Sequence, residues 1–198
     1  MSALKIPWLV ILDKPRTGSE NMAVDIEMFE HCDSPNVRIY SWKNKCISYG
    51  YAQKINDLID VGKAAKDGWE IVKRPTGGGI VYHIPDEVTY SVACPINSLP
   101  EGLMGSYFYI SEIIVKALRS LGVDARLGSR VKGQDGLCFS STREYEISVN
   151  GKKLVGSAQK RGRSAMLQQG SIQFPEICLK KQPSYDEIAS AIKSAFEG

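Results

Sequence analysis

The sequence has few of the side chains that build metal sites and disulfide frameworks. Histidine occurs only at His31 and His83, and no carboxylate and histidine cluster has ligand spacing, so no catalytic metal is expected. The five cysteines are odd in number, widely spaced and free of any C-x-x-C pair. Neither a disulfide framework nor a zinc site is therefore indicated, and a reducing cytoplasm is the expected location.

Long apolar runs are also missing. No stretch approaches the roughly 20 apolar residues that span a bilayer, and the start lacks a basic segment followed by an apolar run, so neither membrane insertion nor secretion is expected. Lys and Arg total 25 against 22 Asp and Glu, and the resulting charge of +3 is far below that of a dedicated nucleic-acid-binding protein. We expect no nucleic-acid partner.

What is present suits one globular domain. The 198 residues are 43% hydrophobic, enough to bury a substantial core, and contain no repeats or long linkers. We expect a single domain over residues 1–198. Helical and strand patterns alternate irregularly, which predicts an α+β fold with a mixed, largely antiparallel sheet.

The clearest helix signals are two capping boxes and one apolar stripe. Thr17 to Glu20 predicts a helix over about residues 19–31, and Ser184 to Glu187 predicts a terminal helix. A longer helix is predicted by Ile110, Ile114, Ala117, Leu118 and Leu121, and Gly122 suits its end.

The strand signals follow a period of two. Extended segments are expected at 37–42, 69–73 and 80–82, with helical turns at 57–67, and residues 88–92 alternate as a half-buried strand should.

A hairpin is predicted around Asn150-Gly151, a strong two-residue turn signal. Its register pairs Val149 with Lys152, Ser148 with Lys153 and Ile147 with Leu154. Lys153 then shares a face with Glu146 and points away from the aliphatic layer.

Three glycines, Gly77, Gly78 and Gly79, follow Arg74 and precede an apolar strand. They permit close backbone approach to a bound group, although a tight turn explains them equally well, and the pattern is neither a standard nucleotide-binding loop nor a dinucleotide fingerprint. His83 and Lys153 are candidate proton-transferring or cationic groups. The alternatives are a structural histidine and a solvated lysine.

Cys138 lies in a polar segment flanked by glycines, where a thiol is accessible and open to activation by a nearby cation. The other cysteines adjoin apolar residues or close a helix, which favours packing roles.

Four ordered segments carry a family resemblance. Residues 74–83 (RPTGGGIVYH) and 151–159 (GKKLVGSAQ) closely resemble two signature segments of the lipoate-protein ligase and octanoyltransferase family, and residues 20–25 and 167–172 resemble its first-helix and late-strand motifs. The family often has a histidine in the late motif, where this chain has Gln168-Gln169. The resemblance spans about residues 17–174.

The resemblance implies a biotin/lipoate protein ligase-like fold. It implies that Lys153 and the glycine turn surround the acyl carboxyl end, with Lys153 stabilising negative charge on the acyl carbonyl. It also places Arg74, Gly77, Gly78, Gly79, His83, Gly156, Ser157 and Ala158 in the substrate site.

The segment after Cys138 resembles the cysteine loop of octanoyltransferases that use a Cys nucleophile, and Tyr145-Glu146 stands where ligases usually carry Asn-Asp. The implied reaction moves an octanoyl group from acyl carrier protein to Cys138, and then to a lysine of a lipoyl domain, in the glycine cleavage H protein or the E2 component of 2-oxoacid dehydrogenases. No cofactor is required, and no C-terminal accessory domain is expected.

Two alternatives remain open. An ATP-dependent lipoate-protein ligase would use ATP and Mg²⁺, with Cys138 incidental and Lys153 against an acyl-adenylate. A non-catalytic subunit would only bind acylated carrier domains.

Overall fold

The structure is a computed structural model that describes residues 7–128, 146–174 and 182–198. Its strands form a seven-stranded sheet of order β1-β2-β6-β10-β9-β8-β7 and a three-stranded sheet of order β4-β3-β5. The strands are β1 (Leu9–Leu12), β2 (Asn36–Tyr40), β3 (Cys46–Tyr49), β4 (Glu70–Lys73), β5 (Val81–His83), β6 (Val88–Pro95), β7 (Arg126–Leu127), β8 (Ile147–Val149), β9 (Lys152–Arg161) and β10 (Ala165–Ile172).

Both sheets are mixed. β1 pairs with β2 and β3 pairs with β4 in parallel, while the other strand pairs are antiparallel. The helices are α1 (Gly18–Glu30), α2 (Val61–Lys66), α3 (Gly102–Ser120) and α4 (Tyr185–Glu197), with 3₁₀ turns at Ile55–Asp57 and Ile96–Ser98. The predicted α+β fold with a largely antiparallel sheet is confirmed.

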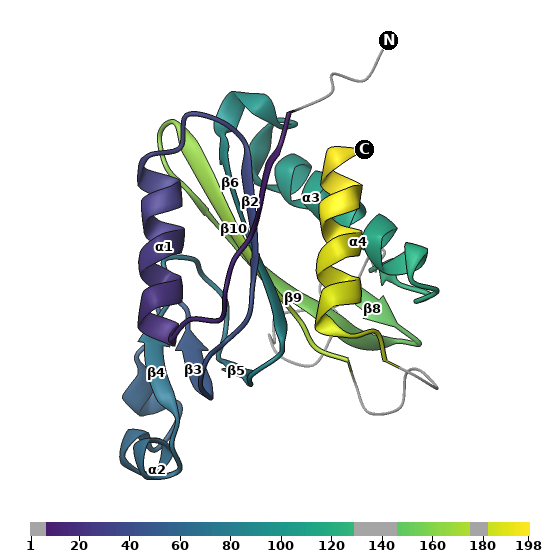
Figure 1. The fold of residues 1–198 in the computed structure, drawn as a ribbon. Coiled ribbons are helices and arrows are strands. Elements are labelled where there is room, and N and C mark those ends of the chain that lie inside the picture. Colours follow the sequence, from purple (N-terminus) through teal and green to yellow (C-terminus); the bar gives the residue numbers. More distant parts are fainter. Residues whose placement is uncertain (1–6, 129–145, 175–181) are drawn as a thin grey trace, which may run out of the picture.

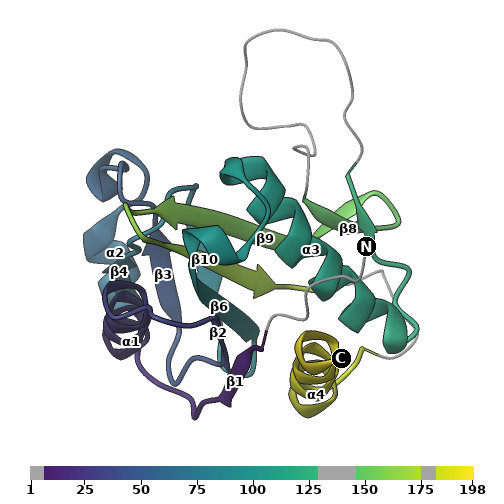
Figure 2. The same ribbon diagram turned by 90° about the horizontal axis from the view of Figure 1, so that it is seen from above.

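The large sheet lies between helices (Figures 1 and 2). α1 covers one face and α3 and α4 cover the other. Alternate β6 side chains, Val88, Tyr90 and Val92, belong to the main core that α3 and α4 complete. Thr89 and Ser91 face α1 and are also buried. β6 is therefore buried on both faces, and the expectation of a half-buried strand was wrong because α1 covers the polar face.

The local helix signals are confirmed. Thr17 and Ser184 each form a capping box, with Glu20 and Glu187 respectively. Gly122, which follows the C-cap residue Leu121 of α3, takes a left-handed φ of 78°. Ile110, Ile114, Ala117 and Leu118 of the expected stripe are buried in α3, while Leu121 is the C-cap residue and is partly buried. None of the helices within the described ranges is long and apolar enough to cross a membrane.

The hairpin differs from its predicted register at one point. Val149 pairs with Lys152 and Ser148 with Lys153, as expected, but Ile147 pairs with Val155 instead of Leu154. A register shift between Ile147 and Ser148 causes the difference, which is a bulge that local turn chemistry does not specify. Lys153 still lies on the side of Glu146, as predicted.

Candidate functional site

A single turn carries the glycines between β4 and β5. Gly78 has a φ of 90°, which a residue with a side chain rarely adopts. The buried Arg74 guanidinium donates through Nη2 to the carbonyl oxygens of Gly77, at 3.1 Å, and Gly79, at 2.6 Å. Arg74 therefore fixes the shape of the loop from within.

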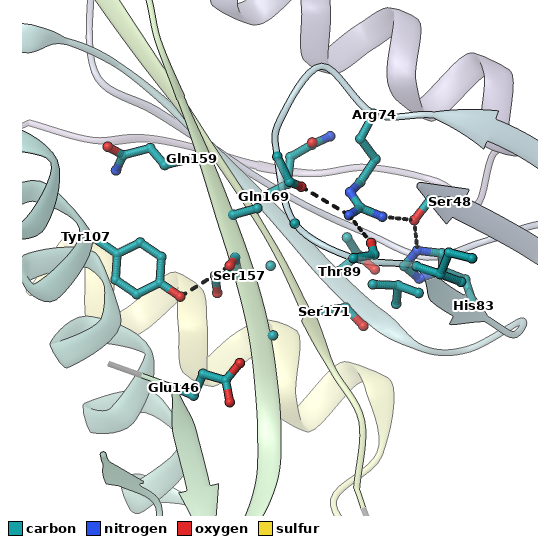
Figure 3. A pocket seen from close by; sticks show the side chains of 18 of the residues that line it. Ser48, Arg74, His83, Thr89, Tyr107, Glu146, Ser157, Gln159, Gln169 and Ser171 are labelled. Carbon is teal, nitrogen blue, oxygen red and sulfur yellow. Dashed lines mark hydrogen bonds between the residues drawn. The ribbon is translucent and has the colours of Figure 1, made fainter. Parts of the chain in front are cut away.

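Arg74 is itself held by Ser48 of β3. Its Nη1 donates to Ser48 Oγ over 2.6 Å, and this oxygen lies 2.6 Å from Nε2 of His83 (Figure 3). On the other side of the ring, His83 Nδ1 lies 2.7 Å from Oε1 of Glu87. A continuous polar chain thus runs from Glu87 to the glycine loop.

Contacts on both sides fix the orientation of the His83 ring. Nδ1 lies against Glu87, which also accepts hydrogen bonds from Thr89, Ser171 and Gln173. Nε2 lies against the Ser48 hydroxyl. The ring also stacks on Trp42 at a centroid distance of 3.9 Å, so His83 is rigidly placed.

Lys153 approaches the same region from β9. Its Nζ lies 2.7 Å from Oε1 of Glu146, and about half of the lysine side chain is exposed. A Cβ on Gly156 would lie 3.0 Å from Lys153 Cε and 3.2 Å from Nζ. The lysine therefore folds back over Gly156, into space that a side chain at this position would share.

These groups line one cavity of about 860 Å³, within the usual range of small-molecule sites. Its wall combines the glycine loop, the start of α3 and the middle of β9 with apolar side chains. The apolar lining includes Met22, Trp42, Ile80, Leu103 and Met104. The cavity can hold a chain-like apolar group with a polar end near the loop and Lys153.

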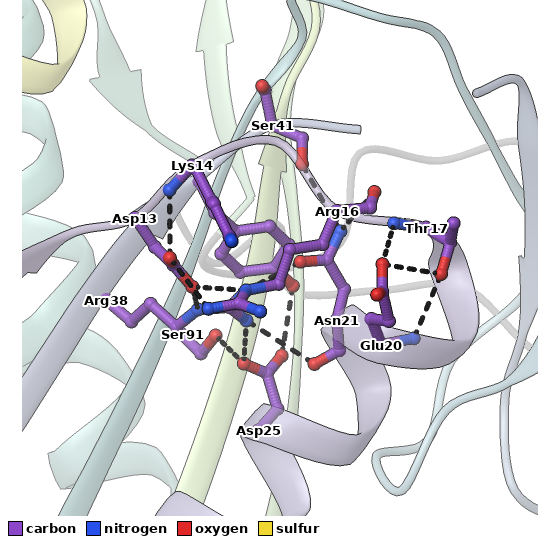
Figure 4. A network of polar contacts seen from close by, with 11 residues as sticks. Asp13, Lys14, Arg16, Thr17, Glu20, Asn21, Asp25, Arg38, Ser41 and Ser91 are labelled. Carbon is purple, nitrogen blue, oxygen red and sulfur yellow. Dashed lines mark hydrogen bonds and ion pairs between the residues drawn. The ribbon is translucent and has the colours of Figure 1, made fainter. Parts of the chain in front are cut away.

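A buried polar network supports the floor of the cavity from α1 (Figure 4). Asp25 accepts hydrogen bonds from Arg38, Tyr40, Ser91 and Gln169, at distances between 2.6 and 2.9 Å. Four donors compensate the burial of this carboxylate.

Gln169 extends the network to the glycine loop. Its amide donates to Asp25 and its carbonyl accepts from Thr76 Oγ1 at 2.7 Å. α1 and the loop are thereby joined through one side chain of β10.

The predicted site residues assemble as a group. Those that line the cavity are Arg74, Gly77, Gly78, Gly79, His83, Lys153, Gly156, Ser157 and Ala158. Cys138 lies outside the described residues. The chemical roles assigned to all of these residues stay predictions.

The other cysteines within the described ranges are placed as the sequence indicated. Cys46 and Cys94 are fully buried, and burial raises the pKa of each thiol to about 12. Cys32 is partly exposed at the end of α1, and burial also raises its pKa. None of these three lines the cavity.

Sequence reasoning missed several cavity residues. Ser48, Tyr107 and Gln159 were not singled out, and Gln169 was noted only for replacing a histidine. Gln159 belongs to the matched 151–159 segment and Gln169 to the late motif, so both were within reach of the resemblance. Ser48 and Tyr107 carry no local signal, because each reaches the site through tertiary packing.

Solved structures share this fold. A lipoate-protein ligase A bound with ATP superposes with a TM-score of 0.78 at 22% identity, covering 98% of this chain and 84% of that one. A bipartite lipoate protein ligase from Thermoplasma acidophilum, solved in a study of an archaeal lipoylation system and its E2 lipoyl domain, gives 0.76 at 21% identity, with 96% and 82% covered.

Two curated relatives have a higher sequence identity to this chain than these solved structures have. The octanoyltransferase LipM of Clostridioides difficile is 36% identical over 176 residues, which is 83% of this chain and 65% of that protein. The corresponding protein of Carboxydothermus hydrogenoformans is 35% identical, with 83% and 64% covered. The chain thus spans slightly less than two thirds of these relatives. Residues 17–175 match the model of the lipoyl protein ligase A/B catalytic domain, and the chain therefore belongs to that family.

Proposed function

We propose that the chain is an octanoyltransferase that modifies lipoyl domains. The octanoyl group would pass from acyl carrier protein to the Cys138 thiolate, and then to a lysine amine of the lipoyl domain. Relatives that carry the octanoyltransferase name at about 35% identity support this reaction. The observation that carries the proposal is the ammonium of Lys153, which lies in the wall of a largely apolar cavity beside the glycine loop.

The cavity suits the acyl group. A saturated chain gains free energy from leaving water, by about 0.8 kcal/mol for each buried CH₂. Met22, Leu103 and Met104 supply flexible apolar surface for it. The polar end of the acyl group then lies near the loop and Lys153.

Lys153 is the proposed electrostatic catalyst. Attack on a thioester carbonyl places negative charge on the oxygen, and an ammonium held nearby stabilises that charge most where water is excluded. Among the described residues, Glu146 holds the Lys153 ammonium and Gly156 lies beneath it. The long, half-exposed side chain lets the terminal amine swing toward the carbonyl.

His83 and Arg74 are proposed as positioning residues. Both ring nitrogens of His83 are engaged, with Glu87 and Ser48, so proton transfer by His83 is not part of the proposal. Arg74, which Ser48 holds in place, donates hydrogen bonds to the carbonyl oxygens of Gly77 and Gly79. These hydrogen-bonded side chains keep the glycine loop in one conformation when substrate enters.

No nucleotide is required for this route, because the carrier thioester is already activated and amide formation from a thioester is downhill. ATP and Mg²⁺ would be needed only if the substrate were a free carboxylic acid. The proposed acceptors are the lipoyl domains of the glycine cleavage H protein and of the E2 component of 2-oxoacid dehydrogenases.

Intact-mass analysis tests the proposal directly. The protein is mixed with octanoyl-acyl carrier protein without ATP, and an apo lipoyl domain is then added. We expect an octanoyl adduct on the enzyme that moves to the lipoyl domain. Cys138→Ser should abolish the adduct, whereas Cys32→Ser, at a cysteine outside the cavity, should not. Modification that occurs only with lipoate and ATP would make the chain a ligase.

A further inference from the structure

Glu146 is the only carboxylate that lines the cavity among the residues that the structure describes. It directly precedes β8, and its side chain is 16% exposed. Its Oε1 lies 2.7 Å from the ammonium of Lys153. The cavity therefore already contains a carboxylate that binds a primary alkylammonium.

The proposed reaction has a requirement that this carboxylate can meet. The acceptor is a lysine side chain, which is an ammonium at neutral pH because its ordinary pKa is about 10.4. An ammonium has no lone pair and cannot attack a carbonyl. A group in the cavity must therefore remove a proton from it.

The other described cavity groups are poorly suited to this task. The nitrogens of His83 are engaged by Glu87 and Ser48, and its ring stacks on Trp42. Burial lowers the pKa of Arg74 to about 10, which still leaves the guanidinium protonated at neutral pH. Lys153 is a cation and donates.

Tyr107 of α3 lies in the same part of the cavity as Glu146 (Figure 3). Burial raises the pKa of its phenol, and the charge of Glu146 adds to the shift, so the phenol stays protonated. Lys153 from β9 and Tyr107 from α3 are thus the titratable groups that face Glu146 from the described elements.

We propose that Glu146 forms the binding site for the acceptor lysine and is the base that deprotonates it. This inference rests on the proposed function, because it requires a lysine as acceptor. The incoming ammonium takes the place of the Lys153 ammonium on Glu146, and Lys153 is released toward the acyl carbonyl. Exchange of one ammonium for another keeps the Glu146 carboxylate paired with a cation.

The chemical step is balanced in atoms and charge. The ammonium gives one proton to Glu146 and becomes a neutral amine, which attacks the thioester carbon. The C–N bond forms and the C–S bond breaks, so that the sulfur leaves as a thiolate. The nitrogen gives its second proton to that thiolate, and Glu146 returns its proton to water. The products are an amide and a thiol.

Glu146→Gln tests this role because the amide keeps the size of the side chain and removes its basicity and charge. The variant is loaded with octanoyl-acyl carrier protein, and the octanoyl adduct is then chased with an apo lipoyl domain at pH 7. We expect an adduct to form and the chase to slow by about 10²- to 10⁴-fold, the usual contribution of a general base. Glu30→Gln, at an exposed carboxylate of α1, is the matched control and should react normally.

Two further readouts separate a base from a structural role. Hydroxylamine, whose amine is neutral at pH 7, should remove the octanoyl group from Glu146→Gln as fast as from the unmodified protein. The chase with the lipoyl domain should also recover as the pH approaches the pKa of the acceptor lysine. Equal slowing with both nucleophiles, or a normal rate with the lipoyl domain, would overturn the proposal.

Failure of the Glu146 inference can be distinguished from failure of the proposed octanoyltransferase function. If the unmodified protein forms no octanoyl adduct, the transferase proposal fails. The same comparison is then made with lipoate and ATP as the acyl source, since a lysine amine is also the acceptor there. Glu146→Gln that modifies the lipoyl domain at the normal rate would overturn the inference in that case too.

Discussion

Thr76 of the glycine loop donates a hydrogen bond to Gln169 of β10 over 2.7 Å, although the two residues lie 93 positions apart. The Gln169 amide donates in turn to Asp25 of α1. The loop that lines the cavity is therefore fastened to α1 through Gln169 of β10. A single side chain must act as donor and acceptor at once to make this link.

This link should be measurable as a coupling energy. Thr76→Val and Gln169→Leu each leave buried polar groups unpaired, so each should lower the free energy of unfolding by about 1–3 kcal/mol. Because both variants remove the same bond, the double variant should lose less than the sum, with a coupling energy of at least about 0.5 kcal/mol. Urea denaturation of the four proteins gives this value.

Gln173 supplies the control for this cycle. It donates to Tyr82 and Glu87 and shares no partner with Thr76. Thr76→Val and Gln173→Leu should therefore be additive. Additivity of Thr76→Val with Gln169→Leu as well would show that the observed bond contributes nothing.

A second prediction concerns the close approach of Gly50 to the glycine loop. A Cβ on Gly50 would collide with the carbonyl oxygen of Gly78 and lie 2.9 Å from the carbonyl carbon of Gly77. Both contacts are with backbone, so Gly50→Ala must move the loop. We expect about 1–3 kcal/mol of destabilisation, the usual result of overpacking, and slower formation of the octanoyl adduct.

Gly79→Ala is the matched control for stability. A Cβ there meets nothing within 4 Å, so thermal unfolding should occur close to the temperature of the unmodified protein. If Gly50→Ala unfolds at the same temperature as Gly79→Ala, the close approach is not a constraint on the loop.

A third prediction separates stability from catalysis at Gly156. Its Cβ would meet only the flexible end of Lys153, which can move aside, so Gly156→Ala should change stability by less than about 0.5 kcal/mol. The displaced ammonium would no longer lie over the strand, and kcat for octanoyl transfer should fall. Gly62→Ala, in α2 and away from the cavity, should leave kcat unchanged. Full transfer activity in Gly156→Ala would argue against a role for the observed position of Lys153.

Local signals in the sequence predicted the helices well. The capping boxes at Thr17 and Ser184 and the glycine after α3 act over a few residues, so short-range chemistry determines them. The hairpin turn was also correct. The register shift between Ile147 and Ser148 was not predicted, because neither the turn residues nor the alternation of side chains marks it.

The site was predicted only where motifs mark it. Arg74, Lys153 and the glycines belong to segments with a recognisable pattern. The groups that hold them do not. Ser48 and Gln169 are polar residues within strands, which alternation alone assigns to a solvated face. Their partners come from α1, β5 and the glycine loop, and pairing at such sequence separation leaves no local pattern.

The last prediction concerns acid stability and Asp13. Burial alone would raise the pKa of this carboxyl, but hydrogen bonds from Arg16 and Arg38 outweigh it and lower the pKa from its ordinary 3.8 to about 2. A group with a lowered pKa in the folded state stabilises the fold above its unfolded pKa. Its contribution is therefore present above about pH 4 and is lost as the pH falls toward 2.

Asp13→Asn should lower the free energy of unfolding at pH 7 and make the decline of that free energy between pH 4 and pH 2 shallower. Urea denaturation across this range measures both effects. Asp124→Asn is the control, since Asp124 and Arg126 form an exposed pair whose side chains are 60% and 71% accessible, and screened pairs contribute little. A decline for Asp13→Asn as steep as that of the unmodified protein would mean that Asp13 is not a source of the acid sensitivity.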